Sequence, residues 1–388
     1  MKILHVIVAF NPELGGPVNS CYLISKNLVR RGHDVTIICS DYKFDTKYAE
    51  SIKEVNIIPF RSIFRIGLFI ITPGMNIWLK KNIKKFDVIH LHEFQSYQNS
   101  VVFCIANKNK VRYVLQARGL APEIMSESFL KNLYNFVWGY RILKFASKNI
   151  ALTEREFEEY IEMGVPKNKI VIIPNGINLE DYNDLPEKGD FKLRYGIKDN
   201  QKIILYLGRL HEIKGLDLLI ESFHYLLKSY NECVLVFVGP DDGYLSNLKK
   251  AVFILGIEEK IIFTGPLYGN DKLLSYVNSD VFVLPSKYEV FGNTILEAWA
   301  CGVPVVVTDT CSLANIIENA GIVVKSNKND LRDAIYKLLI DEKFRIACIN
   351  EGKRVLKTDY DINKVSERIE LLYKSIIGGE NENRNTDH

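Results

Sequence analysis

The chain has 388 residues, about two to three times the length of a typical single domain. Apolar residues make up 47% of it and charged residues 25%, which excludes a largely disordered, collagen-like or disulfide-scaffold protein. The net charge of +3 is unevenly spread, because residues 1–180 hold 24 basic and 16 acidic side chains whereas the remainder is net acidic. This asymmetry suggests two domains, the first facing an anionic partner, although ordinary solvated surface charge would give the same count.

Short β-branched runs alternate with amphipathic stretches through the first half of the chain, in the order typical of parallel βαβ units. The predicted strands are residues 3–10, 34–39, 55–60, 87–92, 113–116, 149–153 and 170–174. Several are apolar without alternation, as expected for parallel strands covered on both faces. Between the first two strands, residues 18–31 have helical spacing and end at Gly32.

The longest nearly uncharged stretch is Ile66–Leu79, which contains Gly67, Pro73 and Gly74. It is too short and too interrupted to cross a bilayer, which takes about 20 apolar residues. Basic residues flank it at positions 61, 65, 80, 81, 84 and 85. Residues 61–85 therefore either lie on an anionic membrane surface or contribute a core helix, and we prefer the core helix.

The same alternation restarts after a polar stretch at residues 178–200. The second set of predicted strands is 203–208, 233–239, 261–265, 281–285, 304–308 and 321–324, with helices such as 217–230 and 270–277 between them. The fold class predicted is α/β with two Rossmann-like, doubly wound parallel sheets. Ligands of such sheets bind at the carboxyl ends of the strands, which would face each other across a cleft.

We place the N-terminal domain at residues 1–177 and the C-terminal domain at residues 178–360. Residues 361–377 have a helical pattern. Residues 378–388 hold two glycines and no apolar residue, so we expect a disordered tail.

Several classes of protein lack support in the sequence. The apolar N-terminus has no cleavage site of a signal peptide, and the seven cysteines have no metal-type spacing, so they are expected to be reduced thiols of a cytosolic protein. Neither GxGxxG nor GxxxxGK[ST] occurs, which argues against a dinucleotide dehydrogenase and a P-loop NTPase. No nucleic-acid-binding motif is present, so a nucleic-acid partner is not expected.

Two loops at strand ends are suited to phosphate groups. Gly15 and Gly16 follow the first strand and precede a helix, where backbone N–H groups can approach an anion, although any tight turn would use such glycines. Arg209 and Lys214 flank a second loop of this kind and could both reach one diphosphate.

The most informative segment is Pro285–Pro304, in which a strand, a glycine-containing loop, a helix and a new strand follow one another. Glu289 lies in the loop and Glu297 within the helix. The two acids suit two hydroxyl-rich parts of one extended ligand better than a dyad that shares a proton. Buried-type neighbours around Glu297 argue against a simple solvated glutamate.

Five motifs in order carry a family resemblance over about residues 1–375. They are Gly15-Gly16, Asp87-Val88-Ile89-His90-Leu91-His92, Ile173-Pro174-Asn175-Gly176-Ile177, Gly208-Arg209-Leu210 with Lys214-Gly215, and Glu289 to Glu297 followed by Gly302-Val303-Pro304. The chain resembles retaining, nucleotide-sugar-dependent glycosyltransferases with the GT-B fold, whose C-terminal part is the glycosyl transferases group 1 domain.

The resemblance implies a role for each matching position. Glu297 would hold the ribose hydroxyls and Glu289 the sugar hydroxyls of the donor, while Arg209 and Lys214 would bind its diphosphate and stabilise the leaving group. The remaining donor contacts implied are Gly15 and Gly16 at the phosphates, the backbone of Phe291 and Gly292 at the sugar, and Leu267 and Tyr268 at the base. The last helix would return to the N-terminal domain, and no metal or other cofactor is implied.

Two positions depart from the family or stay ambiguous. Many members have His-Gly after the fifth strand, whereas this chain has Arg118-Gly119. Arg118 cannot act as a general base, so it binds sugar hydroxyls, binds an anionic acceptor or anchors its loop. His92 ends the fourth strand and is a candidate for the acceptor side, with a structural histidine as the equal alternative.

The resemblance implies an enzyme that transfers a sugar from a nucleoside diphosphate donor to an acceptor hydroxyl, in bacterial or archaeal surface polysaccharide, lipopolysaccharide or glycan assembly. It would be cytoplasmic and peripheral at the inner face of the cell membrane, with a lipid-linked or oligosaccharide acceptor and an anionic membrane surface as partners. Two rivals remain: a non-catalytic sugar-nucleotide-binding partner of another transferase, and a nucleotide-sugar 2-epimerase.

Overall fold

The structure is a computed structural model that describes residues 1–12, 15–66, 69–119 and 129–378. The chain divides into two compact units. The first contains Met1–Gly176 together with the segment from Ile362 onward, and the second contains Ile177–Asp361. The predicted disordered tail lies outside the described residues, apart from Gly378, which ends the last helix.

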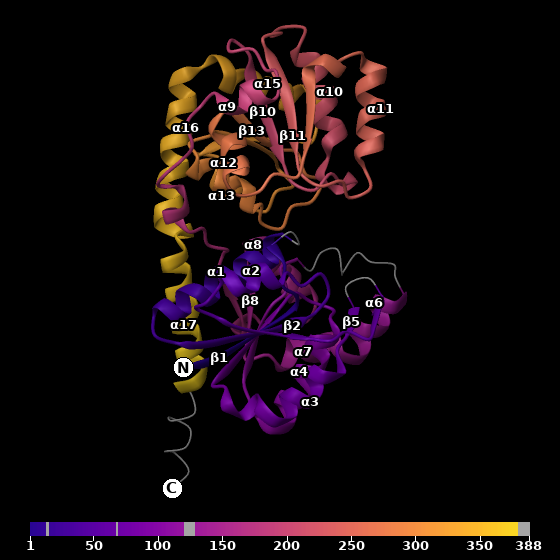
Figure 1. The fold of residues 1–388 in the computed structure, drawn as a ribbon, viewed down its shortest axis with the longest axis vertical. Helices are drawn as coiled ribbons and strands as arrows, with labels where there is room; N and C mark the ends of the chain where they lie inside the picture. The colour runs from indigo at the N-terminus through magenta and orange to yellow at the C-terminus, as the bar shows by residue number, and fades with distance from the viewer. Residues whose placement is uncertain (13–14, 67–68, 120–128, 379–388) are drawn as a thin grey trace. The chain divides into compact units, whose positions relative to one another are not determined.

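The first unit is built on a seven-stranded parallel sheet in the order β3-β2-β1-β6-β7-β8-β9 (Figure 1). Its strands are β1 (Lys2–Ala9), β2 (Asp34–Ser40), β3 (Asn56–Phe60), β6 (Val88–His92), β7 (Tyr113–Gln116), β8 (Lys148–Ala151) and β9 (Ile170–Ile172). Every neighbouring pair is parallel. All seven strands predicted for this part of the chain are therefore confirmed.

Helices cover both faces of this sheet. They are α1 (Gly16–Arg30), α2 (Thr46–Ser51), α3 (Pro73–Asn82), α4 (Tyr97–Asn109), α6 (Phe129–Tyr134), α7 (Tyr140–Phe145), α8 (Glu154–Glu162) and α17 (Ile362–Gly378), with a π-helical turn η3 (Asn135–Gly139) between α6 and α7. Leu4 and Val6 of β1 belong to the core that contains α3, α4 and α7, whereas Ile3 and Ile7 belong to the core that contains α1 and α17. The alternation of side chains along a strand thus separates two helical layers.

The preferred prediction for residues 61–85, a core helix, is wrong for the first half of that segment. Residues Phe64–Ile66 (β4) and Phe69–Ile71 (β5) form an antiparallel pair, and only Pro73 begins a helix, α3. Proline is favoured in the first turn of a helix, so it starts α3 there and does not interrupt one. The two residues between β4 and β5, Gly67 among them, lie outside the described residues.

The second unit is built on a six-stranded parallel sheet in the order β12-β11-β10-β13-β14-β15. Its strands are β10 (Lys202–Leu207), β11 (Cys233–Val238), β12 (Ile261–Gly265), β13 (Val281–Leu284), β14 (Val305–Thr308) and β15 (Gly321–Val324). Its helices are α9 (Asp190–Arg194), α10 (Leu216–Leu226), α11 (Leu245–Leu255), α12 (Gly269–Val277), α13 (Asn293–Ala300), α14 (Ala314–Ile317), α15 (Lys328–Ile340) and α16 (Glu342–Val355). The six predicted strands and the α/β fold class are confirmed.

Each sheet has one point at which the direction of winding reverses. In the first unit the chain runs outward from β1 to β3 and returns to place β6 beside β1, and in the second it runs from β10 to β12 and returns to place β13 beside β10. The loops after such neighbouring strands leave a crevice at the carboxyl edge of the sheet, where ligands of doubly wound folds bind. The loops after β1, β10 and β13 contain the candidate residues Gly15, Arg209, Lys214, Glu289, Phe291 and Gly292. The other candidates lie in or after neighbouring elements: His92 ends β6, Arg118 follows β7, Leu267 and Tyr268 follow β12, Gly16 begins α1 and Glu297 lies in α13.

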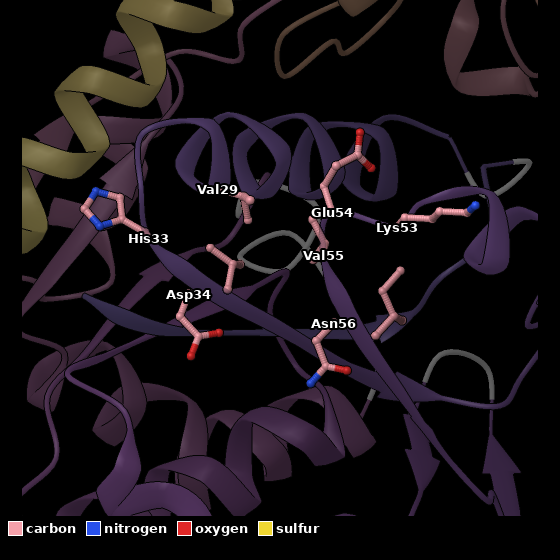
Figure 2. A pocket seen from close by; sticks show the side chains of 9 residues that line it. Val29, His33, Asp34, Lys53, Glu54, Val55 and Asn56 are labelled. Atoms are coloured by element: carbon pink, nitrogen blue, oxygen red, sulfur yellow. The ribbon is translucent and has the colours of Figure 1, made fainter.

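A pocket of about 440 Å³ opens at the other edge of the first sheet (Figure 2). Its lining includes Asp34 and Asn56, the first residues of β2 and β3, together with His33 and Lys53. It therefore lies at the amino ends of the strands, away from the predicted ligand edge.

Among the residues that the structure describes, no helix combines the length and the apolar composition needed to cross a bilayer.

Candidate active site

In the second unit, the loops that follow β10 and β13 are joined by a backbone hydrogen bond. The first runs through a 3₁₀ turn, η6 (Glu212–Lys214), into α10, and the second runs from Pro285 to the start of α13. The N–H of Lys287 donates to the carbonyl of Ile213 at 2.8 Å. The two loops at the reversal point are thus bonded directly to each other.

Two glycines permit this close approach. Gly215 has φ +64°, and a Cβ there would lie 2.1 Å from the carbonyl oxygen of Pro285. Gly239, after β11, has φ +148°, and a Cβ there would lie 1.9 Å from the carbonyl oxygen of Gly208. Only a residue without a side chain allows the backbone to pack so tightly in these conformations.

Lys214 and Glu289 form an ion pair at the centre of this loop pair. Lys214 Nζ lies 2.7 Å from Glu289 Oε2, and both side chains are about 15% exposed (16% and 14%). Glu289 also accepts a hydrogen bond of 3.3 Å from the hydroxyl of Ser286, and its carbonyl accepts bonds from the N–H and hydroxyl of Ser312. Glu289 is therefore held in place by its backbone and by two side chains.

Arg209 lies at the rim of the same region, in a different pair. Its guanidinium is 60% exposed and is paired with Asp242, which follows β11. The carbonyl of Arg209 accepts from the hydroxyl of Tyr206 at 2.9 Å, which fixes the backbone of the loop. Arg209 is thus an exposed charge paired with a carboxylate, Asp242, that the sequence interpretation missed.

Glu297, one turn into α13, contacts two residues of α12. Lys272 Nζ lies 2.9 Å from one carboxylate oxygen, and the hydroxyl of Tyr276 donates to the other at 2.9 Å. Only 17% of the Glu297 side chain is exposed, which rules out a solvated helix glutamate. Burial, followed by the charge of Glu297, raises the pKa of Tyr276 well above its usual value, so it remains a hydrogen-bond donor.

The sequence interpretation missed Lys272 and Tyr276, although a signal was present. Residues four apart on a helix share one face, and 270–277 was predicted to be helical. The other donor-site candidates lie at loop positions. Phe291 is buried with its ring 5.9 Å from that of Tyr360, Gly292 precedes α13 with φ +78°, and Leu267 and Tyr268 connect β12 to α12.

In the first unit, the glycine pair occupies the start of α1. Gly15 is the N-cap, with φ +92° and open space around its Cβ position, and Gly16 is the first helical residue. No side chain caps this helix. A side chain at position 15 would therefore be strained by the positive φ of the backbone and not by crowding from neighbouring atoms.

Three histidines stack in the core below this edge. His5 of β1 is in register with His90 of β6, and the ring centroids of His90 and His92 lie 4.1 Å apart. His92 Nε2 lies 2.8 Å from His5 Nδ1, and His90 Nδ1 lies 2.6 Å from the hydroxyl of Tyr373 in α17. His92 has no exposed surface. Of the two alternatives for His92, this enclosed and hydrogen-bonded geometry favours a structural histidine.

The structure also brings Cys21 of α1 to this cluster, so that His5, Cys21 and His92 offer three metal-ligating atoms within 4.8 Å of one another. Two nitrogens bound to one tetrahedral zinc lie about 3.3 Å apart, whereas the pair here is at the 2.8 Å of a hydrogen bond. Burial raises the pKa of the Cys21 thiol to about 12, so the thiol is protonated in this hydrogen-bonded arrangement. The arrangement fits a hydrogen-bonded core better than a metal site.

Arg118 anchors its own loop. Its guanidinium donates to Asn175 Oδ1 at 2.7 Å and to Gln116 Oε1 at 2.8 Å, and lies 3.2 Å from His92 Nδ1. The neighbouring N–H groups of Ala117 and Gly119 donate to Tyr160 and Glu156. Of its three candidate roles, these contacts favour the loop anchor.

Backbone strain is concentrated at this edge of the first sheet. Glu93, Gln95 and Arg118, none of them glycine, have φ values between +55° and +65°. Glu93 follows β6, and its Oε2 lies 3.4 Å from the N–H of Val8. Residues in such conformations persist where the surrounding structure fixes them, as it does at binding sites.

The histidine stack predicts a pH-dependent stability. Burial lowers the pKa of His5 to about 3 and the pKa values of His90 and His92 well below 6.5. Below about pH 6.5 these histidines are protonated in the unfolded chain but stay neutral in the folded chain. The free energy of unfolding therefore decreases as the pH is lowered, by about 1.4 kcal/mol per pH unit for each histidine. Burial raises the pKa of Glu93 to about 6 and of Glu156 to about 7, which acts in the opposite sense.

We therefore expect His90→Asn to reduce the pH slope of the unfolding free energy by about 1.4 kcal/mol per unit between pH 6 and pH 5. Urea denaturation at several pH values measures it, with His211→Asn as the control, because that histidine lies in the other unit and caps η6. If His90→Asn leaves the slope of the unfolding free energy against pH unchanged, the histidine stack is not the source of this pH dependence.

Two family models match the chain, one in each half. The model described as "Glycosyl transferases group 1" matches residues 188–355, and the model described as "Glycosyltransferase Family 4" matches residues 14–181. The chain therefore belongs to the glycosyltransferases whose C-terminal domain is the glycosyl transferases group 1 domain, and the family assignment made from the five motifs is confirmed.

Relatives span nearly the whole chain. An uncharacterized glycosyltransferase of Methanocaldococcus jannaschii is 28% identical over 96% of this chain and 98% of its own. The N,N'-diacetylbacillosaminyl-diphospho-undecaprenol alpha-1,3-N-acetylgalactosaminyltransferase of Campylobacter jejuni is 29% identical over 91% and 94%. The crystal structure of Anabaena HepE in complex with UDP and glucose has a TM-score of 0.80 at 19% identity, covering 97% of this chain and 100% of HepE. These matches show the GT-B fold.

Proposed function

We propose that this glycosyltransferase moves a sugar from a nucleoside diphosphate donor to an acceptor hydroxyl with retention at the anomeric carbon. The observation that carries the proposal is the Lys214–Glu289 pair, fixed between the two loops at the reversal point of the second sheet. A nearby cation and carboxylate, both largely shielded from water, suit a ligand that has phosphate next to hydroxyl groups.

Different parts of the donor are proposed to bind to different candidate residues, as the family resemblance implies. Lys214 and Arg209 take the diphosphate, Glu289 takes the sugar hydroxyls and Glu297 takes the ribose hydroxyls. Lys272 and Tyr276 orient the Glu297 carboxylate through its two oxygens. The positive charge of Lys214 and Arg209 provides the stabilisation of the leaving group that a divalent cation provides elsewhere, so we propose a reaction independent of added metal.

In the proposed reaction the bond between the anomeric carbon and the diphosphate oxygen breaks, and the acceptor oxygen forms its bond on the same face of the sugar. The acceptor proton passes to the departing phosphate oxygen. Lys214, 2.7 Å from Glu289, would turn from that carboxylate towards the diphosphate as negative charge develops there.

The acceptor is proposed to be a lipid-linked saccharide held by the first unit. The name of the Campylobacter jejuni relative includes a diphospho-undecaprenol acceptor. The basic excess of residues 1–180 supports an anionic acceptor of this kind. The corresponding process would be the assembly of a surface glycan at the cytoplasmic face of a membrane.

Thermal-shift titration with UDP, GDP, ADP and their sugar conjugates tests the donor site. A nucleotide at 100 times its Kd adds about 2.7 kcal/mol to the stability of the native state, so the matching nucleotide should raise the melting temperature by several degrees. We expect Arg209→Ala to weaken that shift, because the diphosphate loses a cation.

Arg354→Ala is the matched control for this titration. Arg354 is 61% exposed, lies in the second unit and is paired with Glu351, just as Arg209 is 60% exposed and paired with Asp242. Its removal should leave the nucleotide shift intact. An undiminished shift in Arg209→Ala would contradict a diphosphate site at Arg209, and equal shifts by UDP, GDP and ADP would contradict selection of one base. Proton NMR of the first-formed product and assays in EDTA then test retention and metal independence.

A further inference from the structure

A stripe of exposed apolar side chains runs along one helix of the first unit. Elements α6, η3 and α7 form a continuous helical segment from Phe129 to Phe145. Phe129, Leu133, Phe136 and Tyr140 are 76%, 46%, 79% and 50% exposed, and they recur at intervals of four, three and four residues. Their spacing matches one face of a helix, while Tyr134 and Ile142 on another face are buried.

The β4–β5 hairpin extends this apolar surface. Phe64 and Ile66 of β4 are 55% and 56% exposed. Ile66 lies opposite Phe69 in the pair, so their side chains share one face of the hairpin, and the Phe69 ring lies 6.1 Å from that of Tyr134 in α6. The hairpin and the helix are thus neighbours, as Figure 1 shows beside the labels β5 and α6.

The two stretches of sequence that carry this surface are rich in basic residues. No acidic residue occurs between Glu54 and Asp87 or between Glu127 and Glu154, whereas these two stretches contain six and four basic residues. Arg65, Arg141 and Lys144 are exposed on the elements themselves. Asp41, which is bonded to Ser62 beside β4, is an acidic neighbour, so the excess of basic charge is large but not complete. Exposed apolar groups on segments with such an excess match an anionic lipid surface, into which aromatic side chains insert while basic ones stay at the headgroups.

We propose that the face made by Phe64, Ile66, Phe129, Leu133, Phe136 and Tyr140 docks the first unit on an anionic lipid bilayer. We call these six residues the apolar face. Most of it lies outside residues 61–85, the segment whose composition had suggested a membrane contact. A group of exposed apolar side chains on neighbouring elements marks an interaction site, and the excess of basic charge on these elements favours an anionic lipid bilayer over a protein partner of mixed charge.

The second unit provides an internal comparison. Phe253 and Ile254 of α11 are 74% and 80% exposed, and Lys249 and Lys250 lie on the same helix. Acidic residues follow closely at Glu258 and Glu259. Exposure and basic charge are therefore found at both places, and the apolar face differs in having six exposed apolar side chains where α11 has two.

Co-sedimentation with vesicles tests the proposal on the full chain, without donor or acceptor. We expect binding to vesicles of equal parts phosphatidylglycerol and phosphatidylcholine, and much weaker binding to phosphatidylcholine alone. Phe129→Ser combined with Phe136→Ser should lower the partition coefficient at least about tenfold. Arg141→Gln and Lys144→Gln should each lower it about fivefold on anionic vesicles only.

Phe253→Ser combined with Ile254→Ser is the matched control and should bind vesicles as the wild type does. Unchanged melting temperatures show that the variants fold, since all these side chains are exposed. Absence of vesicle binding by the wild type, equal loss in the control, or a dimer abolished by Phe129→Ser with Phe136→Ser would each overturn the proposal. The nucleotide titration is independent of this result, so failure of the docking face and failure of the donor site can be told apart.

Discussion

Replacing Lys214 by alanine is expected to slow transfer about 10²–10³-fold at saturating donor, the usual cost of removing one preorganised group that stabilises developing charge. Lys214 is 16% exposed, so water cannot easily replace its charge at the leaving diphosphate. The loss should fall mainly on kcat, because the negative charge on the bridging oxygen grows in the transition state. Release of nucleoside diphosphate from the donor that gives a thermal shift provides the assay.

Lys287→Ala is the control for that substitution. Lys287 follows β13 only a few residues before Glu289, but it is 54% exposed and paired with Glu212, which is 65% exposed. An exposed pair of this kind contributes little, so its rate should stay within twofold of wild type. A Lys214→Ala enzyme that keeps a third or more of the wild-type kcat would refute the role of Lys214 in the chemical step, whatever its donor affinity.

Replacing Gly215 by alanine is expected to destabilise the second unit and to abolish nucleotide binding. The new Cβ would meet the backbone oxygen of Pro285 at 2.1 Å, and a main-chain atom cannot rotate away as a side chain can. To make room, the loop after β10 must separate from the loop that carries Glu289 and Lys287. Urea denaturation and the nucleotide thermal shift measure the two consequences.

At Gly215 alanine would cost free energy in two ways, through its left-handed backbone conformation and through its close contact with Pro285. Gly196→Ala measures the first of these alone. Gly196 has the same φ of +64° in the same unit but has nothing within 4 Å of its Cβ position. Gly196→Ala should lower the free energy of unfolding by about 1–2 kcal/mol, the cost of a left-handed conformation in a residue with a side chain, and leave nucleotide binding unchanged. Gly215→Ala should cost about 3 kcal/mol more, the upper end of the range for overpacking. Equal losses in the two variants would show that the close contact with Pro285 has no energetic weight.

The sheets could be predicted from sequence because a parallel strand that is buried on both faces appears in the sequence as a short continuous apolar run. β1 and β11 are clear examples. The β4–β5 hairpin could not, because its strands have three residues each and lie in a stretch without period. Pro73 was misinterpreted for a related reason: proline ends helices and also begins them, and its neighbours decide which.

The candidate site was predictable to the level of its loops. Glu289, Glu297, Arg209 and Lys214 could be chosen because their motifs fix the place of each along the chain. The partner of Arg209 could not, because its pairing with Asp242 depends on the neighbouring strand β11. The histidine stack shows the same limit, since His5 and His92 are joined by strand order and not by spacing.

The first unit is assembled from both ends of the chain, and this has a consequence for how it is made on the ribosome. Its core includes Ile362, Val365, Ile369 and Tyr373 of α17, which are synthesised after the whole of the second unit. At 5–20 residues per second, the apolar side chains of α1 that α17 covers wait roughly 17 to 70 s for this partner. A nascent chain therefore completes its second unit while the first is still open, and translation that stops before Ile362 yields a protein with an unfinished core for proteases to recognise.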